Sequence, residues 1–320
     1  MIVITGGAGF IGSNLINYLV QRNKDKIVSV DWHSKKNQNY FSDKNFETIK
    51  PDSILSFLKK NINKISVVVH LGAITSTTEQ NLDLIVKNNL DLSINLWKWC
   101  KSNRKRFIYA SSAATYGNGN NGFNDDHNDQ NLSKLIPLNL YGWSKHVVDR
   151  FIWHRQQKNR LLQCVGLKFF NVYGPNEYHK KEMRSIVLKI FENINSNKTV
   201  QLFKSHNKKY KDGEQLRDFI YVKDVVKVID WFIENKNVNG LFNVGSGKPQ
   251  SFKDLSKFVF RNCNKKFLIE YVPTPINIRK QYQYFTKANI SKLRKAGYKG
   301  KFFNLEDGVS DYVKNYLIKI

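Results

Sequence analysis

The feature that most constrains this chain is a glycine loop within its first 12 residues. The segment Ile2–Thr5 runs into Gly6, and further glycines follow at Gly9 and Gly12 before an amphipathic segment begins. This spacing allows a tight turn, close approach of a pyrophosphate to the backbone, and close packing of the next helix on the strand. Free N–H groups at a helix N-terminus attract phosphate. The loop therefore predicts the first strand, turn and helix of a dinucleotide-binding unit.

The same alternation of apolar strand and amphipathic helix continues through the first half of the chain. Continuous runs of Val, Ile and Phe are typical of parallel strands that are buried on both faces. Strands are expected at Ile2–Thr5, Ile27–Asp31, Val67–Leu71, Phe107–Ser111 and Val165–Phe169. Helices are expected at Gly12–Arg22, Ser53–Lys60, Asn88–Ser102 and Tyr141–Gln157. This order predicts an α/β fold of the Rossmann type, with a doubly wound parallel sheet.

The pattern changes after about Asn171, where loops and polar spacing become more frequent. We therefore expect residues 1–170 to form the dinucleotide-binding domain. Two later apolar segments, Asp218–Val222 and Gly240–Val244, are predicted to return to its sheet, so that residues near 217–246 complete it. Residues 171–216 and 247–320 are expected to form a smaller, mixed α/β part that binds substrate.

The residues after the second strand carry two conflicting signals about the cofactor. Asp31 ends that strand, where a carboxylate accepts hydrogen bonds from the adenosine ribose and favours NAD. His33, Lys35 and Lys36 follow at once, and a cation there favours the 2′-phosphate of NADP. The residues alone leave NAD and NADP open.

A second constellation points to proton transfer. Ser112 lies at the end of the fourth predicted strand, and Tyr141 and Lys145 open the following long helix. Tyr141 and Lys145 are one turn apart on the same face, and an ammonium beside a phenol stabilises the phenolate and lowers its pKa. The phenol then exchanges a proton with a substrate hydroxyl while hydride moves to or from a nicotinamide, and the serine holds that hydroxyl. The order of glycine loop, acidic strand end, serine and Tyr-x-x-x-Lys carries the prediction, because Tyr40 and Lys44 have the same spacing without that context.

The formal net charge of +26 admits two interpretations. A basic surface is typical of proteins that bind nucleic acid. However, 41 of the 52 basic residues are Lys, and they are spread from Lys24 to Lys319, as expected from compositional drift; we expect no nucleic-acid partner. The alternative from another class is a non-catalytic dinucleotide-binding protein that holds RNA, and the complete Ser112–Tyr141–Lys145 set argues against it.

Other composition features exclude several classes. No run of 18 uncharged apolar residues occurs, so no membrane span is expected. The N-terminal residues lack the pattern of a secretory signal, and the three distant cysteines Cys100, Cys164 and Cys263 are typical of reduced thiols. A cytoplasmic protein is expected. The seven histidines show no metal spacing, so no metal site is predicted, and His70 is expected to be a core histidine with satisfied hydrogen bonds.

Several longer motifs extend these two constellations along the chain. They are Thr5–Asn14, Thr75–Glu79, Tyr109–Gly117, Phe170–Pro175, His179-Lys180, Arg217–Val222 and Gln283–Lys287. By these motifs the chain resembles the extended short-chain dehydrogenase/reductases, of the NAD-dependent epimerase/dehydratase group, and within them it resembles the family of ADP-heptose 6-epimerases. The Ser-Thr-Thr-Glu stretch and His179-Lys180 are more specific than the superfamily motifs.

The resemblance implies an isomerase that inverts C6 of ADP-heptose through a transient ketone, for lipopolysaccharide heptose supply, and that works as a homo-oligomer. It also implies tightly bound NADP, with Lys36 at the phosphate despite Asp31. The implied catalytic residues are Ser112, Tyr141, Lys145 and Lys180. The implied cofactor contacts are Gly6, Gly9, Phe10, Ile11, Gly12, Asp31, Trp32, Lys36, Leu71, Gly72, Ala73, Asn88, Tyr141, Lys145 and Val172. The implied substrate contacts are Ser112, Asn171, Lys180, Phe203, Arg217 and Tyr282.

The chain departs from the family pattern in its substrate half. Trp143 stands where the family commonly has Tyr, Lys181-Glu182 follow His179-Lys180 in place of small residues, and the loop Lys204–Leu216 is longer and more charged. A related 4,6-dehydratase carries an Asp-Glu pair where this chain has Ala113-Ala114, and alanine neither donates nor accepts a proton. Dehydration is therefore not expected, whereas the motifs leave a nucleotide-sugar 4-epimerase open.

Overall fold

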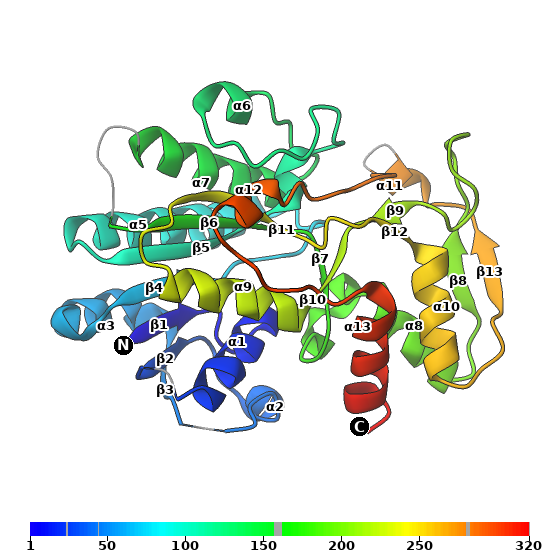
Figure 1. Ribbon diagram of the computed structural model, residues 1–320, viewed down its shortest axis with the longest axis horizontal. Coiled ribbons are helices and arrows are strands. Elements are labelled where there is room, and N and C mark those ends of the chain that lie inside the picture. The colour runs from blue at the N-terminus through cyan, green and yellow to red at the C-terminus, as the bar shows by residue number, and fades with distance from the viewer. Residues whose placement is uncertain (24, 44, 157–161, 280–281, 320) are drawn as a thin grey trace.

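A seven-stranded sheet forms the centre of the computed structural model, which describes residues 1–23, 25–43, 45–156, 162–279 and 282–319. Its strands are β1 (Ile2–Thr5), β2 (Ile27–Val30), β3 (Glu47–Ile49), β4 (Val67–His70), β5 (Arg106–Ser112), β6 (Cys164–Phe169) and β11 (Gly240–Val244). They lie in the order β11-β6-β5-β4-β1-β2-β3, and all neighbours are parallel (Figure 1). The chain first builds outward from β1 to β3 and then crosses to β4 on the other side. The predicted doubly wound parallel sheet is confirmed.

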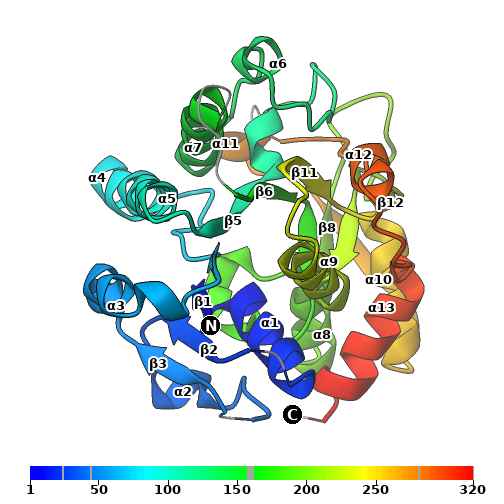
Figure 2. The same cartoon turned by 60° about the vertical axis from the view of Figure 1, so that its left-hand side comes forward.

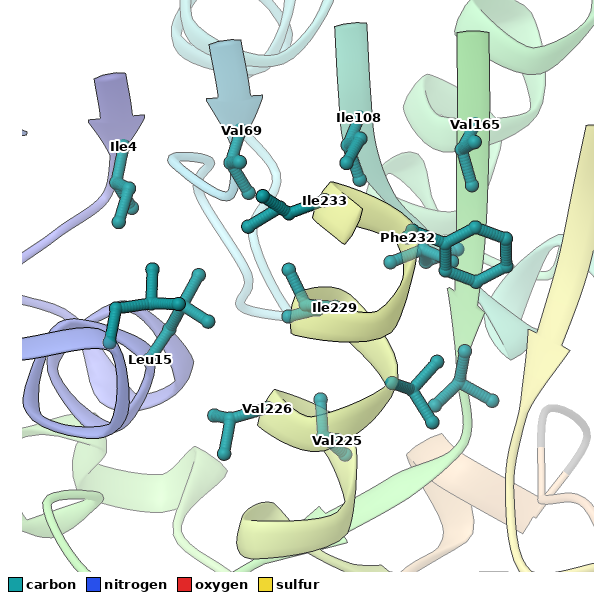
Figure 3. Packing of buried hydrophobic residues seen from close by; sticks show 14 of the residues in the cluster. Ile4, Leu15, Val69, Ile108, Val165, Val225, Val226, Ile229, Phe232 and Ile233 are labelled. Carbon is teal, nitrogen blue, oxygen red and sulfur yellow. The ribbon is translucent and has the colours of Figure 1, made fainter. Parts of the chain in front are cut away.

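Helices cover both faces of this sheet (Figure 2). The helices α1 (Phe10–Gln21) and α9 (Val222–Glu234) pack on one face, and α3 (Ile54–Lys60), α5 (Leu92–Ser102) and α7 (Leu140–Gln156) pack on the other. Successive side chains of a strand point to opposite faces. Ile4 therefore joins the core under α1 and α9, as Figure 3 shows, whereas Val3 joins the core under α5 and α7. This double burial explains why the strands read as continuous apolar runs.

Three details of the Rossmann part differ from the predictions. Helix α1 begins at Phe10, two residues before the predicted start, because the extended residue Gly9 is its N-cap. The helix predicted from Asn88 starts inside a π-helical turn, η3 (Val86–Asp91), which joins α4 (Leu82–Ile85) to α5. Strand β3 was not predicted, because its three residues lie at the sheet edge and none of them is buried.

Only one of the two later apolar segments joins the main sheet. Gly240–Val244 does so as β11, next to β6. The prediction for Asp218–Val222 is wrong: β10 (Phe219–Tyr221) pairs with β7 (Asn171–Tyr173) in a separate two-stranded sheet. The physical reason is that Phe219 and Tyr221 pack into a second apolar core instead of the sheet's own.

That second core belongs to a smaller, mixed α/β part. Its centre includes Val187, Val200, Leu255, Val259 and Val309. Its helices are α8 (Ile186–Asn195), α10 (Phe252–Asn262) and α13 (Leu305–Tyr312). Its strands pair as β8 (Val200–Phe203) with β13 (Ile269–Val272) and as β9 (Leu216–Arg217) with β12 (Gln250–Ser251). Figure 1 shows this part beside the carboxyl ends of the main sheet.

Shorter elements complete the described chain. The short helices are α2 (Lys35–Gln38), α6 (Asp129–Ser133), α11 (Ile276–Arg279) and α12 (Ser291–Lys295). Short 3₁₀ or π segments are η1 (Pro51–Ser53), η2 (Ile62–Lys64), η4 (Ala113–Tyr116), η5 (Tyr178–Met183) and η6 (Val313–Leu317). Within the described ranges, no helix has the length and apolar character needed to cross a bilayer.

Candidate active site

A large cavity opens where the carboxyl ends of β1, β4 and β5 meet the smaller part. Its volume is about 780 Å³, within the usual range for small-molecule sites. It lies where the chain crosses from one half of the sheet to the other, the place at which doubly wound sheets bind ligands. The predicted site residues that line it are Gly6, Gly9, Phe10, Ile11, Gly12, Asp31, Trp32, Leu71, Gly72, Ala73, Asn88, Ser112, Tyr141, Lys145, Asn171, Val172 and Lys180.

The glycine loop has the shape that a dinucleotide phosphate requires. Gly6 has φ +70°, and a Cβ on it would lie 2.6 Å from the nitrogen of Gly72. A Cβ on Gly12 would lie 2.0 Å from the carbonyl oxygen of Gly6. The N-cap Gly9 has no side chain to cap the first turn of α1, so the amides of that turn remain available to an anion. The residues present therefore fit a dinucleotide pyrophosphate.

The acidic strand end is tied to this loop. Asp31 accepts hydrogen bonds from the backbone nitrogens of Ala8 (2.9 Å) and Trp32 (2.7 Å). His33 has other contacts: its Nε2 lies 2.8 Å from the Ser29 hydroxyl, and its ring lies 5.8 Å from that of Phe41. The other two cations, Lys35 and Lys36, lie in α2, and their side chains are outside the described part of the structure.

Ser112, Tyr141 and Lys145 meet at one wall of the cavity. Ser112 ends β5, and its side chain caps η4 by accepting from the nitrogen of Ala114 (3.1 Å). Helix α7 comes close to η4 because Gly142 has no side chain; a Cβ there would lie 2.8 Å from the oxygen of Ala114. This approach places Tyr141 within hydrogen-bond reach of Ser112. The three groups can hold and exchange a proton at one substrate oxygen.

The electrostatics of this wall differ in part from the expectation. Burial raises the pKa of Tyr141, and its hydrogen bond with Ser112 opposes the rise. Lys145 donates from Nζ to the oxygen of Ala110 (2.9 Å), and burial lowers the pKa of Lys145 to about 8. Lys145 is thus held by the strand, and the predicted lowering of the Tyr141 pKa by this ammonium is not seen.

Lys180 lines the same cavity from η5, in the other half of the chain. Its Nζ lies 5.1 Å from the centre of the Phe10 ring, at the start of α1. Burial lowers the pKa of Lys180, whereas the negative charge of Glu177 opposes the change. A lysine in such a setting can exchange a proton near neutral pH. Two groups capable of proton transfer, Tyr141 and Lys180, therefore share one cavity.

Three of the predicted substrate contacts form a separate cluster. The guanidinium of Arg217 lies 5.4 Å from the Tyr282 ring, and the rings of Phe203 and Tyr282 lie 6.0 Å apart. None of the three lines the cavity. Phe252, which does line it, packs against Arg217 at 5.5 Å. The cluster thus continues from the cavity through Phe252, a residue that the sequence did not single out.

Two supporting residues were also missed. Asn89, next to Asn88 in η3, accepts from the nitrogen of Ile74 (2.8 Å) and donates to its oxygen (2.9 Å) and to the Ser144 hydroxyl (3.0 Å). It therefore joins the loop after β4 to the helix that carries Tyr141. Asp149 lies one turn beyond Lys145 on α7, and this four-residue spacing is the signal that could have identified it.

Asp149 is the centre of a fully buried polar network. It accepts from Tyr109 (2.9 Å) and Ser111 (2.7 Å) of β5 and pairs with Lys168 of β6 at 2.9 Å. Lys168 also donates to the hydroxyl of Thr115 in η4 (2.5 Å). The network fixes β5, η4 and α7 relative to one another, and these elements carry the Ser112–Tyr141–Lys145 wall.

His70 and the acidic groups carry no metal site in the described chain. His70 is buried, with Nδ1 2.6 Å from the Thr5 hydroxyl and Nε2 2.8 Å from the Ser93 hydroxyl, and burial lowers its pKa to about 3. The prediction of a satisfied core histidine is confirmed. Over the described ranges, no group of three or more His, Cys, Asp or Glu side chains is placed to hold a metal ion.

Relatives of known name match along the whole chain. The ADP-L-glycero-D-manno-heptose-6-epimerase of Fusobacterium nucleatum subsp. nucleatum is 43% identical over 329 residues, which cover 100% of this chain and 98% of that protein. The protein of the same name from Brachyspira hyodysenteriae is 38% identical, with 98% of this chain and 97% of that protein covered.

Solved structures give the same picture of the fold. The crystal structure of Helicobacter pylori ADP-L-glycero-D-manno-heptose-6-epimerase matches with a TM-score of 0.77 and 30% identity, covering 98% of this chain and 95% of that chain. A UDP-N-acetylglucosamine 4-epimerase from Methanobrevibacter ruminantium M1, in complex with UDP-N-acetylmuramic acid, matches with a TM-score of 0.85 and 25% identity, covering 100% of this chain and 98% of that chain.

The family follows from a third comparison. The sequence model of the NAD dependent epimerase/dehydratase family matches residues 2–245. This range contains the glycine loop, the Ser112–Tyr141–Lys145 wall, Lys180 and all seven strands of the main sheet. The chain therefore belongs to the NAD dependent epimerase/dehydratase family.

Proposed function

We propose that the protein interconverts ADP-D-glycero-D-manno-heptose and ADP-L-glycero-D-manno-heptose, as an ADP-heptose 6-epimerase that supplies heptose for lipopolysaccharide. The observation that carries this proposal is that Tyr141 and Lys180, two groups capable of proton transfer from different halves of the chain, line one cavity. The full-length relatives at 43% and 38% identity bear the name of this enzyme. A nucleotide cofactor follows from membership of the family.

The reaction requires protons to be handled at two positions. A nicotinamide dinucleotide, held by the glycine loop and by Lys145, would supply the hydride chemistry that oxidises C6 and then reduces it from the opposite face. Tyr141, with Ser112 holding the oxygen, exchanges the proton of the C6 hydroxyl in one orientation. The resulting ketone rotates about the bond to the sugar ring, which moves its oxygen away from Tyr141. Lys180 exchanges the proton in the second orientation, so that each epimer has its own acid–base group.

For the cofactor, the proposal is NADP held through many turnovers, with Lys36 at its 2′-phosphate. Both carboxylate oxygens of Asp31 already accept backbone hydrogen bonds, which leaves them less capacity to bind ribose hydroxyls. Lys145, beside Tyr141, is the proposed contact for the nicotinamide ribose. Mass spectrometry of the purified protein after acid release tests this part: NADP is expected, and recovery of NAD alone would contradict it.

The substrate is proposed to lie across the two parts of the chain. Residues 1–170, with α9 and β11, bind the dinucleotide, whereas residues 171–216 and 247–320 bind the sugar nucleotide. Asn171 and Lys180 line the cavity where the sugar would lie. Arg217, with Tyr282 and Phe203, offers a cation and two aromatic faces for the ADP portion. As part of the same proposal the protein is cytoplasmic and homo-oligomeric. Light scattering, which measures the molar mass in solution, tests the oligomeric state.

Two variants test the assignment of the acid–base groups. In Lys180→Met, turnover of both epimers should fall by about two to four powers of ten, the usual contribution of acid–base catalysis, with little change in substrate affinity. Lys98→Met, at an exposed position on α5, is the matched control and should retain parental turnover. If affinity falls and turnover survives at saturation in Lys180→Met, Lys180 binds the diphosphate and the second group lies elsewhere.

A second candidate function has one observation in its favour. The Methanobrevibacter 4-epimerase has a TM-score of 0.85 against this chain. Inversion at C4 of a sugar would need the same class of cofactor and the same Ser112–Tyr141–Lys145 group. Incubation with UDP-N-acetylglucosamine separates the two proposals. Turnover of that substrate, with ADP-heptose left unchanged, would favour the 4-epimerase.

A further inference from the structure

We propose that Arg184 is a positioning residue that holds a strained turn at Lys181 and thereby fixes Lys180 in the cavity. The inference rests on the proposed role of Lys180 in proton transfer. It concerns Lys181-Glu182, the segment that directly follows Lys180 in η5. The strain and the contacts that hold it come from the backbone and from α8.

Lys181 has a backbone conformation that suits glycine. Its φ is 49° and its ψ is −119°, a region in which a Cβ meets its own backbone. In the described chain, six non-glycine residues have positive φ, and four of them are Asn, the residue that tolerates it best. A lysine persists in such a conformation only where its surroundings hold it there.

Arg184 supplies that hold. Its Nε donates to the carbonyl oxygen of Lys181 at 2.7 Å, and its backbone nitrogen donates to the same oxygen at 3.3 Å. Its NH1 pairs with Glu192 of α8. Two donors on one carbonyl oxygen fix the peptide plane that follows Lys181, and the ion pair fixes the donor to a helix.

The two ends of the turn are held as well. Glu177 is buried and accepts from the nitrogen and the hydroxyl of Ser185, which closes the loop from Glu177 to Ser185. The nitrogen of Lys180 donates to the oxygen of Glu177 at 3.0 Å. Lys189 donates to the oxygen of Glu182 at 2.7 Å. Lys180 is therefore one residue from the strained position inside a closed loop. A change in the backbone dihedral angles of Lys181 would thus rotate Lys180 directly.

Arg184 also lines the cavity, so direct binding of a substrate phosphate is the competing role. The geometry favours positioning, because Nε and NH1 are already committed to Lys181 and Glu192. The two roles differ in their response to glycine at position 181. Glycine at position 181 adopts this conformation without strain and does not need the Arg184 hydrogen bonds. Glycine there could not, however, replace a phosphate contact that Arg184 had made.

The experiment compares Arg184→Met, Lys181→Gly and the double variant in the full chain, with ADP-heptose as substrate. Arg184→Met is expected to lower kcat by about 10- to 100-fold, as small misplacements of a reacting group do, with KM changed less than about twofold. Lys181→Gly should keep parental kcat and raise the Tm. In the double variant, kcat should return to within about threefold of the parent, because the unstrained turn no longer needs Arg184. Arg155→Met, on the exposed surface of α7, is the control and should match the parent.

Hydrogen exchange gives a readout that does not depend on turnover. The amides of residues 180–185 should exchange faster in Arg184→Met and return to the parental rate in the double variant. A raised KM in Arg184→Met that Lys181→Gly leaves unchanged would overturn the proposal in favour of phosphate binding. Unchanged kcat and exchange in Arg184→Met would overturn it as well. Failure of the proposed function is distinguishable, since Lys180→Met would then be as active as the parent.

Discussion

The buried pair between Asp149 and Lys168 gives the most quantitative prediction. Both side chains are 0% exposed and their atoms lie 2.9 Å apart. In Lys168→Met the carboxylate of Asp149 keeps only its bonds from Tyr109 and Ser111 and loses its charge partner. An uncompensated buried charge of this kind costs about 3–5 kcal/mol of unfolding free energy.

A control variant and a double-mutant cycle separate the energy of this buried pair from other effects of the substitutions. Arg261→Met removes one partner of the pair with Glu306, whose side chains are 68% and 48% exposed, and should cost less than about 1 kcal/mol. The double variant Asp149→Asn/Lys168→Met removes both charges of this pair, so it should lose clearly less stability than the two single variants added together.

The assay is urea denaturation followed by tryptophan fluorescence, with the four variants measured in one buffer. The same network fixes the elements that carry Ser112, Tyr141 and Lys145, so kcat of Lys168→Met should fall together with its stability. The reasoning is refuted if Lys168→Met loses less than about 1 kcal/mol, since that loss is typical of an exposed pair.

Three further predictions concern single groups. Tyr141→Phe keeps the ring and the fold, so its melting temperature should stay parental while turnover drops by about two to four powers of ten; near-normal turnover would remove Tyr141 from the mechanism. The pKa of Lys145 is lowered to about 8, so kcat should fall as the pH rises through about 8, and Lys145→Arg, which keeps its charge, should lack this limb in whatever activity it retains. Burial raises the pKa of Asp224 to about 6; the folded state therefore favours the protonated form, and stability falls as the pH rises from about 4 to 6. Asp224→Asn should accordingly be more stable than the parent by about 2 kcal/mol at pH 7.5 and not at pH 4.5, whereas equal changes in melting temperature at both pH values would contradict the assignment.

The sheet could be predicted because its strands are buried on both faces. Ile2–Thr5 and Val67–His70 place alternate residues in two different cores, so every position before the final Thr5 and His70 is apolar. Strand β3 could not be predicted in this way, since Glu47–Ile49 is at the sheet edge and none of its residues is buried. The pairing of β10 with β7 could not be predicted either. The periodicity of a sequence shows which face of a strand is buried, but it does not show which strand lies beside it.

The site was predictable where chemistry is local and not where it depends on tertiary contacts. Spacing alone placed Tyr141 and Lys145 on one face of α7, and the glycine loop predicted its own turn. The chain folding that joins Phe252 to Arg217, or Asn89 to Ile74, has no local pattern. The strain at Lys181 is likewise invisible in sequence, since only the structure shows which backbone conformation the turn requires.

The most direct test of the central claim uses ADP-D-glycero-D-manno-heptose that carries deuterium at C6. The protein as purified, with no added dinucleotide, is incubated with it in ordinary water, and NMR follows both C6 epimers. The account predicts conversion to the L-glycero epimer with deuterium retained at C6, because the hydride that leaves C6 returns to the same carbon. Absence of conversion, or an epimerised product whose C6 carries solvent hydrogen, would contradict it.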